Sequence, residues 1–596
     1  MPSYKAPIDD IRFVLEDVLG VERVSMLPGY EDATPDLLTQ VLEELAKFAE
    51  NELQPLNRSG DEEGCTFENG VVRTPKGFKA AYDRYREAGW TAVSADPDYG
   101  GQGLPQVVNF VMSEILSSAN MSFGMYPGLS HGAYEALHQH GSDDLKALYL
   151  PRLVDGTWSG TMCLTEPHCG TDLGLIRTKA MPQDDGSFAI TGTKIFISAG
   201  EHDLTENIVH LVLAKLPDAP AGTRGISLFV VPKFLARHDG TPGPRNGVAC
   251  GSIEHKMGIK ASATCVMNFD GARGWLVGRP HGGMRAMFTM MNAARLGVAM
   301  QGLGIGEVAY QNAVQYAKDR LQGRSLTGAK VPEKAADPII VHPDVRKNLL
   351  WIRALNEGSR ALGYWLGMQI DTALKHPDPT ARQEADDFVA LMTPIAKSFF
   401  TDYGFEAAVK AQQLYGGHGY IREWGMEQFV RDARIAQIYE GANAIQALDL
   451  VGRKLPMHMG RLLRRFFHPL GAELEAAMED PATAEMAGQL AKAYGRLQQA
   501  TAWVAQKGMG NPDEAGAASA DYLRLFALVA VGWMWMRMAK AAAAKLPTAN
   551  GNAAFYDAKL KTAAFFYARI LPETSSLFAA IMSGAKPMMA MTADQF

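Results

Sequence analysis

The spacing of hydrophobic residues divides the chain into helical and extended stretches. Leu37, Val41, Leu42 and Leu45 recur at the 3.6-residue period of a helix, and residues 34–153 are mostly helical in pattern. The pattern then changes to short runs of β-branched and aromatic residues bounded by Gly, Pro or Asp, at 188–191, 208–213 and 226–231. These runs predict an antiparallel β-domain that ends near residue 278.

Helical periodicity returns after residue 282. Residues 344–374 and 386–415 show it over long stretches, which favours a helical bundle up to about residue 453. The rest of the chain is rich in Ala and Met, again helical in pattern, and is divided by Pro481, Pro512 and Pro547. The predicted fold class is mainly α with a central β-domain. The predicted domains are an N-terminal extension (1–33), a helical domain (34–157), the β-domain (158–280), the bundle (281–455) and a C-terminal helical domain (456–596).

Three other segments are informative. Residues 99–105 must form a loop, because glycines and a proline at that density cannot continue a helix. The most apolar run, 525–536, is well short of the roughly 20 residues that span a bilayer, so we expect a buried helix and no membrane span. Residues 1–10 lack the basic start and apolar stretch of a signal peptide, and we expect a cytoplasmic protein.

Composition and charge narrow the function. With 596 residues, the chain is long enough for about three or four domains of roughly 100–200 residues. The formal net charge is −7 and there is no dense run of Lys or Arg, which argues against nucleic-acid binding and favours small-molecule chemistry. The five cysteines show no Cys-x-x-Cys spacing, so we expect free thiols in a reducing compartment.

Two segments of the predicted β-domain are suited to a polar aromatic ring. Residues 162–172 combine the hydroxyl residues Thr165 and Thr171 with small residues around Gly170, which leaves backbone N–H groups and hydroxyls exposed. In residues 194–200, Phe196 is followed two positions later by Ser198, on the same face of a strand. That pair can stack on, and hydrogen-bond to, one aromatic cofactor.

Together these segments resemble the acyl-CoA dehydrogenase family, whose pattern is hydrophobic-Thr-Glu-Pro-x-x-Gly-Ser/Thr-Asp followed by Trp/Phe-Ile-Thr/Ser-Asn-Gly. Phe196 stands where Trp is commoner, and Ala199 stands where the family has Asn. The resemblance implies an acyl-CoA dehydrogenase-like fold and an FAD cofactor. It also implies that Leu164, Thr165, Phe196 and Ser198 surround the flavin ring and that Thr171 lies between flavin and thioester.

Further segments match the family in the same order. Residues 256–262 lie in the β-domain, and residues 282–284 with Arg295 open the bundle. In residues 316–322, the resemblance places Arg320 at the FAD pyrophosphate of a neighbouring subunit, because a guanidinium offers forked donors to phosphate oxygens. Gly323 and Arg324 stand where the family has Phe-Gly. Residues 413–420 match Gln-x-x-Gly-Gly-x-Gly-Tyr/Phe, whose glycines let the backbone approach the adenosine half of FAD.

The last match, residues 431–446, contains Glu440. In the family, the glutamate before this glycine is the catalytic base, and a carboxylate between an apolar helix and a glycine turn is expected to be partly desolvated. Ala442 and Ala444 stand where many relatives carry Thr and Gln that touch FAD.

The resemblance assigns the remaining site residues. Glu440 is the catalytic residue, and no metal site is expected. The residues expected to bind FAD are Met162, Leu164, Thr165, Gly170, Thr171, Phe196, Ser198, Arg320, Gln322, Gln413, Gly416, Gly417 and Asn443, and those expected to bind the substrate are Thr171, Asn292, Arg295, Glu440 and Gly441.

The implied reaction converts an acyl-CoA thioester to the trans-2-enoyl-CoA. Glu440 removes the α-proton, a hydride leaves the β-carbon for the flavin, and the electrons pass to an electron-transferring flavoprotein. The enolate must be stabilised at the carbonyl oxygen, and the resemblance assigns this role to the backbone N–H of Glu440 and a ribityl hydroxyl of FAD.

The two extensions refine the substrate expected from the resemblance. Residues 4–7 and 12–15, the variant at 322–324 and the C-terminal domain resemble a long bacterial subgroup. Its members act on 3-(methylthio)propanoyl-CoA, in dimethylsulfoniopropionate degradation, and on the straight-chain acyl-CoAs of fatty-acid metabolism. We expect a homodimer, because such C-terminal domains often cover the surface where a second dimer would sit. The alternatives are an acyl-CoA oxidase, a family member repurposed to bind DNA, and a structural or binding protein without flavin.

Three further features are interpreted as structural. The glycines of 302–306 follow no strand and predict close helix packing and not a dinucleotide site. His131, His138 and His140 lack a metal-helix spacing and are expected to be solvated or hydrogen-bonded. The methionines around Met534, Met536 and 588–591 are interpreted as core filler.

Overall fold

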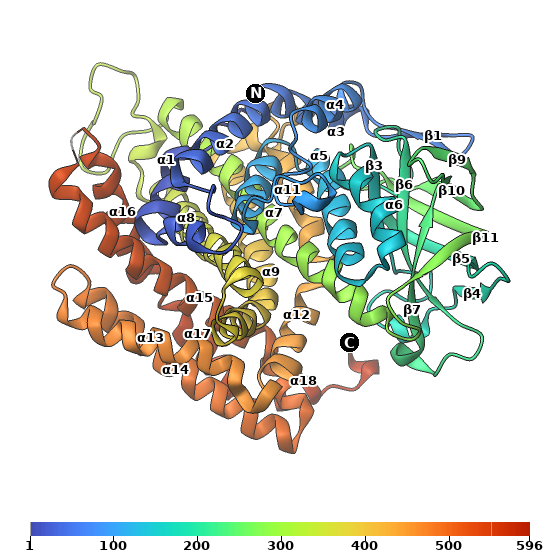
Figure 1. Cartoon of the computed structure of the whole chain (residues 1–596). Helices are drawn as coiled ribbons and strands as arrows, with labels where there is room; N and C mark the ends of the chain where they lie inside the picture. The colour runs from blue at the N-terminus through green and yellow to red at the C-terminus, as the bar shows by residue number, and fades with distance from the viewer. Residues whose placement is uncertain (1, 550) are drawn as a thin grey trace. The chain divides into compact units, whose positions relative to one another are not determined.

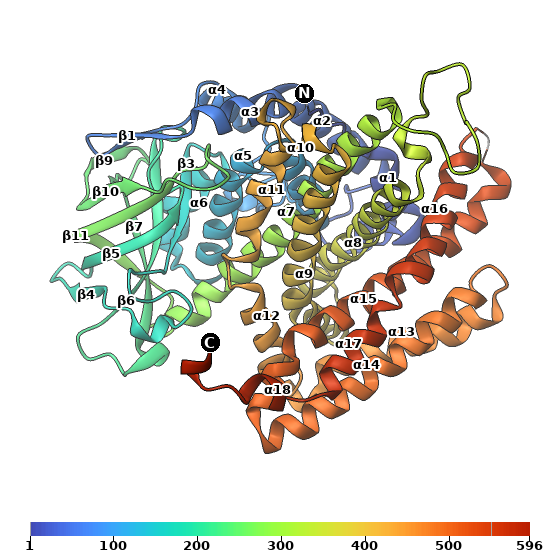
Figure 2. The ribbon, with the colours of Figure 1, turned by 180° about the vertical axis from the view of Figure 1, so that it is seen from behind.

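The computed structural model describes residues 2–549 and 551–596, and the chain divides into two compact units (Figures 1 and 2). The helical unit comprises Met1–Ala46, Pro105–Glu114 and Val298–Phe596, and the sheet unit comprises Lys47–Leu104 and Ile115–Gly297. The α-helices are α1 Ile8–Arg12, α2 Pro35–Phe48, α3 Gln54–Glu63, α4 Phe78–Glu87, α5 Gln106–His140, α6 Asp143–Val154, α7 Gly283–Asp319, α8 Pro343–Lys375, α9 Pro379–Leu414, α10 Gly417–Tyr420, α11 Met426–Arg434, α12 Asn443–Asp449, α13 Arg461–Glu479, α14 Ala484–Gly510, α15 Pro512–Lys545, α16 Ala553–Phe565, α17 Glu573–Met582 and α18 Lys586–Met589.

The sheet unit is built on a seven-stranded sheet, as the predicted β-domain requires. Its strands, in the order β10-β11-β5-β4-β6-β3, are joined by β7, which pairs with both β11 and β6. Most pairings are antiparallel as predicted, but β3 pairs with β6 in parallel, and so does β4 through one residue pair. The strand bounds are β1 Thr66–Glu68, β2 Val71–Arg73, β3 Trp158–Cys163, β4 Lys179–Pro182, β5 Phe188–Ser198, β6 Asn207–Lys215, β7 Ile226–Pro232, β8 Phe234–Ala236, β9 Pro242–Arg245, β10 Val248–Ile253 and β11 Thr264–Val277.

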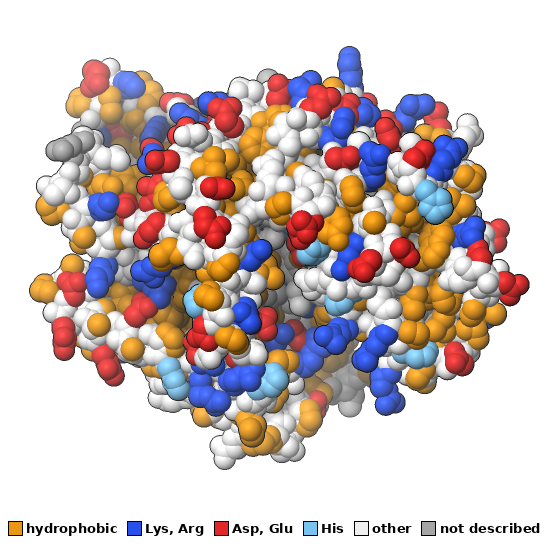
Figure 3. Space-filling view, in the orientation of Figure 1, with side chains coloured by type: hydrophobic (Ala, Val, Ile, Leu, Met, Phe, Trp, Pro, Cys, Tyr) orange, Lys and Arg blue, Asp and Glu red, His pale blue; other side chains and the backbone are white. Residues whose placement is uncertain are grey.

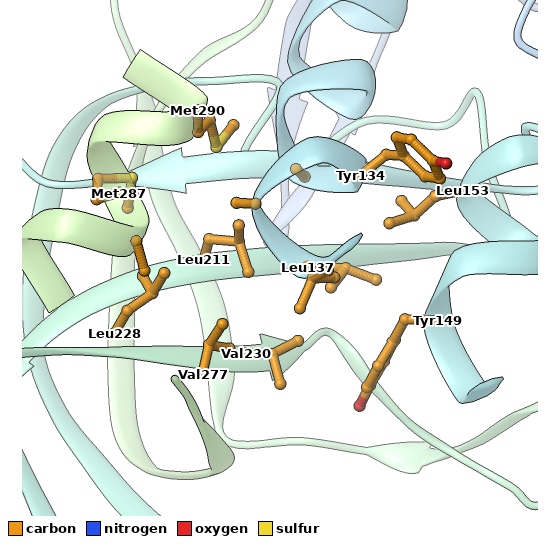
Figure 4. Packing of buried hydrophobic residues seen from close by; sticks show 14 of the residues in the cluster. Tyr134, Leu137, Tyr149, Leu153, Leu211, Leu228, Val230, Val277, Met287 and Met290 are labelled. Atoms are coloured by element: carbon orange, nitrogen blue, oxygen red, sulfur yellow. The ribbon is translucent and has the colours of Figure 1, made fainter. Parts of the chain in front are cut away.

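Strands β6 and β7 are buried along almost their whole length, so most of their residues are apolar on both faces, with His210 and Ser227 among the buried polar exceptions. On one face, Leu211, Leu228 and Val230 belong to a cluster that includes residues of α5, α6 and α7 (Figure 4). The other face packs into a second cluster around Phe229 and Val212. The sheet is therefore covered on both faces, which holds the strand ends firmly in place.

The helical unit is dominated by α8, α9 and α15, with α8 and α9 running side by side (Figures 1 and 2). The predicted close helix packing at residues 302–306 is confirmed. A Cβ on Gly302 would lie 2.2 Å from the carbonyl oxygen of Phe400, and a Cβ on Gly404 would lie 2.2 Å from the carbonyl oxygen of Gly302. These glycines let the backbones of α7 and α9 approach closely.

The apolar run at 525–536 lies in α15, and every residue of it is buried. Residues Pro512–Thr548 are long and apolar enough to cross a membrane, but 83% of the most apolar window is buried inside the structure. The prediction of a buried core helix is therefore confirmed.

The interpretation of the last methionines as core filler is wrong. Met588, Met589 and Met591 are 56%, 61% and 46% exposed, whereas Met534 and Met536 are buried as predicted. Helix α18 has only four residues, so it has no long apolar face with which to join a core.

His138 and His140 are hydrogen-bonded, and His131 lies near a carboxylate, as the structural interpretation of these histidines predicts. His138 Nε2 lies 3.1 Å from an oxygen of Asp96, His140 Nε2 lies 2.8 Å from the hydroxyl of Thr289, and His131 faces Glu135 at 3.8 Å.

Acidic and basic side chains are both spread over the face of the molecule shown in Figure 3.

A buried cluster of charges joins distant parts of the helical unit. Arg360 of α8, only 1% exposed, donates to Glu114 of α5, to Glu307 of α7 at 3.0 Å, and to Asp10 of α1. Asp10 is also paired with Lys559 of α16. Burial alone would lower the pKa of Arg360, but the surrounding carboxylates raise it well above its usual value, so the guanidinium stays charged.

Asp371 of α8 caps the start of α5. Its carboxylate accepts hydrogen bonds from the backbone N–H groups of Gln106 at 2.6 Å and Val107 at 3.0 Å, which have no partner within their own helix. Burial raises the pKa of Asp371 to about 7, although these bonds oppose the rise.

A carboxyl whose pKa is raised on folding makes the folded state bind more protons than the unfolded state between about pH 4 and pH 7. The stability of the helical unit should therefore fall as the pH rises through this interval, by about 1.4 kcal/mol for each unit of pKa difference. In Asp371→Asn this contribution disappears. The free energy of unfolding, measured by denaturant titrations between pH 4.5 and 8, should therefore fall less steeply with pH than in the parent. Equal slopes for both proteins would contradict the assignment.

Candidate functional site

The two segments predicted to surround the flavin ring lie side by side in the sheet unit. The first begins at the end of β3 and the second lies in β5. The backbone N–H of Ile195 donates to the carbonyl oxygen of Thr165 at 2.9 Å, and Lys194 Nζ donates to the carbonyl oxygen of Leu164 at 2.9 Å. Lys194 is also paired with Glu166 at 2.9 Å. The buried Lys194 thus binds both segments into one surface.

That surface suits a planar polar ring. Phe196 is 60% exposed although it lies within β5, and its backbone takes the left-handed conformation with φ of 59°. The side-chain hydroxyls of Thr165 and Ser198 make no hydrogen bond within the described part of the chain. An exposed aromatic face beside two hydroxyls that are free to donate or accept is what an isoalloxazine ring requires.

Gly170 and Thr171 lie in an exposed turn just before a short 3₁₀ helix, Leu173–Leu175. Asp172 holds this turn by accepting the backbone N–H of Gly174 at 3.0 Å. Met162 is half-buried in β3. The turn thus follows the Thr165 segment directly, and the hydroxyl of Thr171 is open to a ligand.

Glu166, His168 and Cys169 bring three potential metal ligands within 4.8 Å of one another. The carboxylate of Glu166 is already engaged, since it pairs with Lys194 and accepts hydrogen bonds from Arg177 and Thr178. Burial acts to raise the pKa of Glu166, but the charge of Lys194 and the hydrogen bonds to the carboxylate together lower it. We therefore interpret this group as part of the surface that Lys194 joins and assign no metal to it.

Two predicted substrate residues lie three positions apart on α7, so they share one face of the helix. Arg295 is buried and donates to the side-chain oxygen of the exposed Asn292 at 3.4 Å. The guanidinium also lies over the ring of Phe288, 5.6 Å from its centroid. These contacts hold the cation of Arg295 in a fixed direction.

The predicted adenosine segment follows the end of α9 in the helical unit. Gln413, Gly416 and Gly417 are exposed, and Gly416 has φ of 58°. A Cβ on Gly416 or Gly417 would meet no atom within 4 Å, whereas one on Gly419 would lie 2.2 Å from the carbonyl oxygen of Gln412. The first two glycines leave open space for a ligand, and the third is needed for packing.

Arg320 and Gln322 are exposed at the end of α7, where a loop begins. The loop folds around the buried Asp337, which accepts backbone N–H groups from Ser325, Lys330 and Val331. Arg324 donates to the same carboxylate at 3.2 Å. Arg324, which replaces a glycine of the family pattern, therefore has a structural role in closing this loop.

Glu440 lies in the turn between a short 3₁₀ helix, Ile435–Gln437, and α12. It is half-buried, and its backbone takes the left-handed conformation with φ of 58°, which is rare for residues other than glycine. The neighbouring Tyr439 donates its hydroxyl to Gln301. Burial, followed by the charge of Glu440, raises the pKa of Tyr439. The glutamate is thus presented on a strained, half-buried turn.

The side chain of Asn443, predicted to bind FAD, makes several bonds within the helical unit. Its amide nitrogen donates to Asp402 at 2.7 Å and to Thr401 at 2.9 Å, and its oxygen accepts from Lys397 Nζ at 2.8 Å. Sequence reasoning missed Lys397, Thr401 and Asp402. The available signal was a lysine inside the apolar run 391–400 of α9, a position where lysine is seldom buried without partners.

Ala442 is the N-cap of α12 and makes no capping hydrogen bond. Ala442→Thr supplies a hydroxyl that can accept a backbone N–H of the first turn, so we expect it to stabilise the helical unit by about 0.5–2 kcal/mol in denaturant unfolding. Ala442→Val is the matched control, because it has the same shape without the hydroxyl. Equal stabilities of the Thr and Val variants would contradict the capping account.

A cavity of about 980 Å³ lies elsewhere in the helical unit, against the N-terminal extension, α8, α13 and α15. None of the predicted site residues lines it. Its walls carry both acidic and basic residues over the apolar Trp365, Met368 and Met536. The predicted site and this cavity are therefore separate features.

Family models cover most of the chain in the order of the predicted domains. The N-terminal domain of acyl-CoA dehydrogenases matches residues 36–157, the middle domain 161–272, and the C-terminal domain 281–455. A further model, described as acetyl-CoA dehydrogenase C-terminal like, matches residues 470–592. The chain therefore belongs to the acyl-CoA dehydrogenase family, whose members are FAD-dependent oxidoreductases.

Individual members of the family are similar to the chain over most of its length. The chain is 46% identical, over 96% of its length and 97% of the relative, to the 3-methylmercaptopropionyl-CoA dehydrogenase of Ruegeria pomeroyi. It is 34% identical to a butyryl-CoA dehydrogenase of Syntrophomonas wolfei, over 96% of this chain and 95% of the relative. Among solved structures, an acyl-CoA dehydrogenase from Bacillus anthracis complexed with FAD shares the fold, with a TM-score of 0.73, 20% identity, and coverage of 94% of this chain and 89% of that one.

Proposed function

We propose that the protein catalyses the FAD-dependent α,β-dehydrogenation of 3-(methylthio)propanoyl-CoA, with Glu440 as the base. The observation that carries the substrate is the 46% identity over 96% of the chain to a dehydrogenase of that thioester. The base is supported by the placement of Glu440 on a strained, half-buried turn that a buried network holds. The reaction would belong to dimethylsulfoniopropionate degradation.

Each residue of the site has a separate role in the proposed reaction. The carboxylate of Glu440 takes the proton from the α-carbon, and the backbone N–H of Glu440 donates to the thioester carbonyl oxygen, where negative charge develops. Phe196, Thr165 and Ser198 would hold the flavin ring. Arg320 would bind the pyrophosphate of the FAD of a neighbouring subunit, and the open glycines Gly416 and Gly417 would leave room for an adenosine half. FAD, when bound, accepts the hydride that leaves the β-carbon.

Partners and location follow from the same proposal. The two electrons taken from each thioester must leave before the next turnover, and an electron-transferring flavoprotein is the proposed acceptor. The protein is proposed to be a cytoplasmic homodimer.

A second candidate is the dehydrogenation of straight-chain acyl-CoAs. It is favoured by the butyryl-CoA dehydrogenase above and by a broad-specificity linear acyl-CoA dehydrogenase of Mycobacterium tuberculosis, which is 34% identical over 97% of both chains. The two candidates differ only in the acyl chain, so one assay separates them.

The test is anaerobic bleaching of the enzyme-bound flavin by a panel of thioesters. We expect 3-(methylthio)propanoyl-CoA to give a higher kcat/KM than butanoyl-, octanoyl- and palmitoyl-CoA, with reoxidation by an electron-transferring flavoprotein. A higher value for a straight chain would favour the second candidate. Peroxide formed in air at the rate of substrate loss, with no added acceptor, would instead define an oxidase.

A further inference from the structure

We propose that Lys397 is a positioning residue for the base: its buried ammonium group holds the Glu440–Gly441 turn in the conformation that presents the carboxylate. This inference deepens the proposed function and rests on Glu440 being the base. Lys397 itself lies in the middle of α9 and is not expected to touch the substrate or the cofactor.

The first observation is where the ammonium group points. Lys397 is 0% exposed, and its Nζ donates to the backbone carbonyl oxygen of Gly441 at 2.8 Å and to the side-chain oxygen of Asn443 at 2.8 Å. A lysine is almost never fully buried unless its donors are satisfied, so these contacts account for its presence inside the unit. Both acceptors lie within three residues of Glu440.

The second observation is that α9 holds the turn from both ends. Five residues along from Lys397, Asp402 accepts the side-chain amides of Gln437 and Asn443, each at 2.7 Å. Gln437 lies three residues before Glu440 and Asn443 three residues after it. The segment that carries the base is therefore fixed at three points to one rigid helix: at Gln437, at Gly441 and at Asn443.

The turn needs such support because its backbone is strained. Glu440 has φ of 58° and Gly441 has φ of 84°, so two successive residues take left-handed conformations. For a residue with a side chain this conformation is unfavourable and persists only when surrounding contacts determine it. Gln446 adds weaker contacts, at 3.4 Å to the carbonyl oxygen of Glu440 and 3.3 Å to that of Gly441. The contact from Lys397 to the carbonyl oxygen of Gly441, at 2.8 Å, is shorter than both contacts from Gln446.

Lys397→Met removes the ammonium group but keeps an unbranched apolar side chain in the same space. The turn can then relax, and the carboxylate is displaced from the α-carbon. A displacement of about 1 Å can lower the rate about 10²-fold, so we expect kcat for flavin reduction to fall about 10²-fold. Flavin content and the dissociation constant of the enoyl-CoA product should stay near those of the parent, because Lys397 is fully buried and its proposed role is confined to the turn. Hydrogen exchange of residues 438–446 should become faster.

The decisive comparison uses Glu440→Gln as background. If Lys397 acts through Glu440, adding Lys397→Met to Glu440→Gln should lower the residual rate by less than about threefold, because groups that act as a unit are not additive. Lys559→Met is the matched control: Lys559 is also buried, at 1% exposed, and pairs with Asp10, away from the turn. Lys559→Met should lower the free energy of unfolding but should not lower kcat selectively while product binding stays unchanged.

Parent-like kcat in Lys397→Met, or a full 10²-fold loss in both backgrounds, would overturn the inference. If Lys397→Met does not fold, Lys397→Arg keeps the charge and moves the donors, and should give a smaller fall in kcat with unchanged product binding; parent-like kcat there would also overturn it. A Glu440→Gln enzyme as active as the parent would instead refute the proposed function. The two failures are therefore distinguishable.

Discussion

Arg360→Met is expected to lower the free energy of unfolding of the helical unit by about 3–5 kcal/mol, because it leaves buried carboxylates without their cation. Arg360 is shared by Glu114, Glu307 and Asp10, all of them buried. Removing one partner from such a cluster costs much more than the cluster contributes over an apolar core, since the remaining charges stay desolvated.

Unfolding in guanidinium chloride, followed by circular dichroism, measures this change in the free energy of unfolding. The control is Arg12→Met, which removes an exposed pair with Glu16 at 3.0 Å and should change stability by no more than about 1 kcal/mol. If Arg360→Met unfolds at the same denaturant concentration as Arg12→Met, the cluster does not stabilise the unit as described.

Glu440→Gln is expected to slow flavin reduction by about 10²–10⁴-fold, the range that a positioned general base contributes. Glutamine has nearly the same shape as glutamate but cannot accept the α-proton, so flavin content and product binding should be unchanged. Stopped-flow absorbance under anaerobic conditions measures the rate. Glu475→Gln, on the exposed face of α13, is the matched control and should behave like the parent.

An undiminished rate in Glu440→Gln would show that another group removes the proton. A loss of bound flavin in that variant would show that Glu440 supports the cofactor and not the chemistry. Both outcomes are read from the same preparation, because the flavin absorbance reports its content before substrate is added.

Much of the fold could be predicted from the sequence because local periodicity determines it. The predicted helices 344–374 and 386–415 correspond to α8, Pro343–Lys375, and α9, Pro379–Leu414. The apolar run 525–536 is buried as predicted. The parallel pairing of β3 with β6 could not be predicted in this way, because strand pairing depends on contacts between distant segments.

The buried cluster of charges could not be predicted from the sequence for the same reason. Asp10 is 350 residues from Arg360 and 549 residues from Lys559 along the chain. No local pattern distinguishes such residues from charges on a solvated helix face. The exposed methionines at the end of the chain show the opposite error, since an apolar composition predicted burial where a four-residue helix offers no packing surface.

The candidate site divides in a similar way. Motif spacing selected the residues predicted to surround the flavin ring, and the structure brings the segments of Thr165 and Phe196 together through the buried Lys194. Motif spacing also located Glu440, but not the buried side chains of α9 that hold its turn, because Lys397 and Asp402 lie about 40 residues earlier. The roles assigned to the individual residues and the domain boundaries remain predictions.

The most direct test of the central claim, that Glu440 removes the α-proton of an acyl-CoA, is exchange of that proton with solvent. The enzyme is first reduced with dithionite, so that no hydride can be accepted, and is then incubated with 3-(methylthio)propanoyl-CoA in D₂O. Mass spectrometry should show deuterium at the α-carbon with the parent enzyme and only the uncatalysed level with Glu440→Gln. Equal incorporation by both proteins would contradict the account.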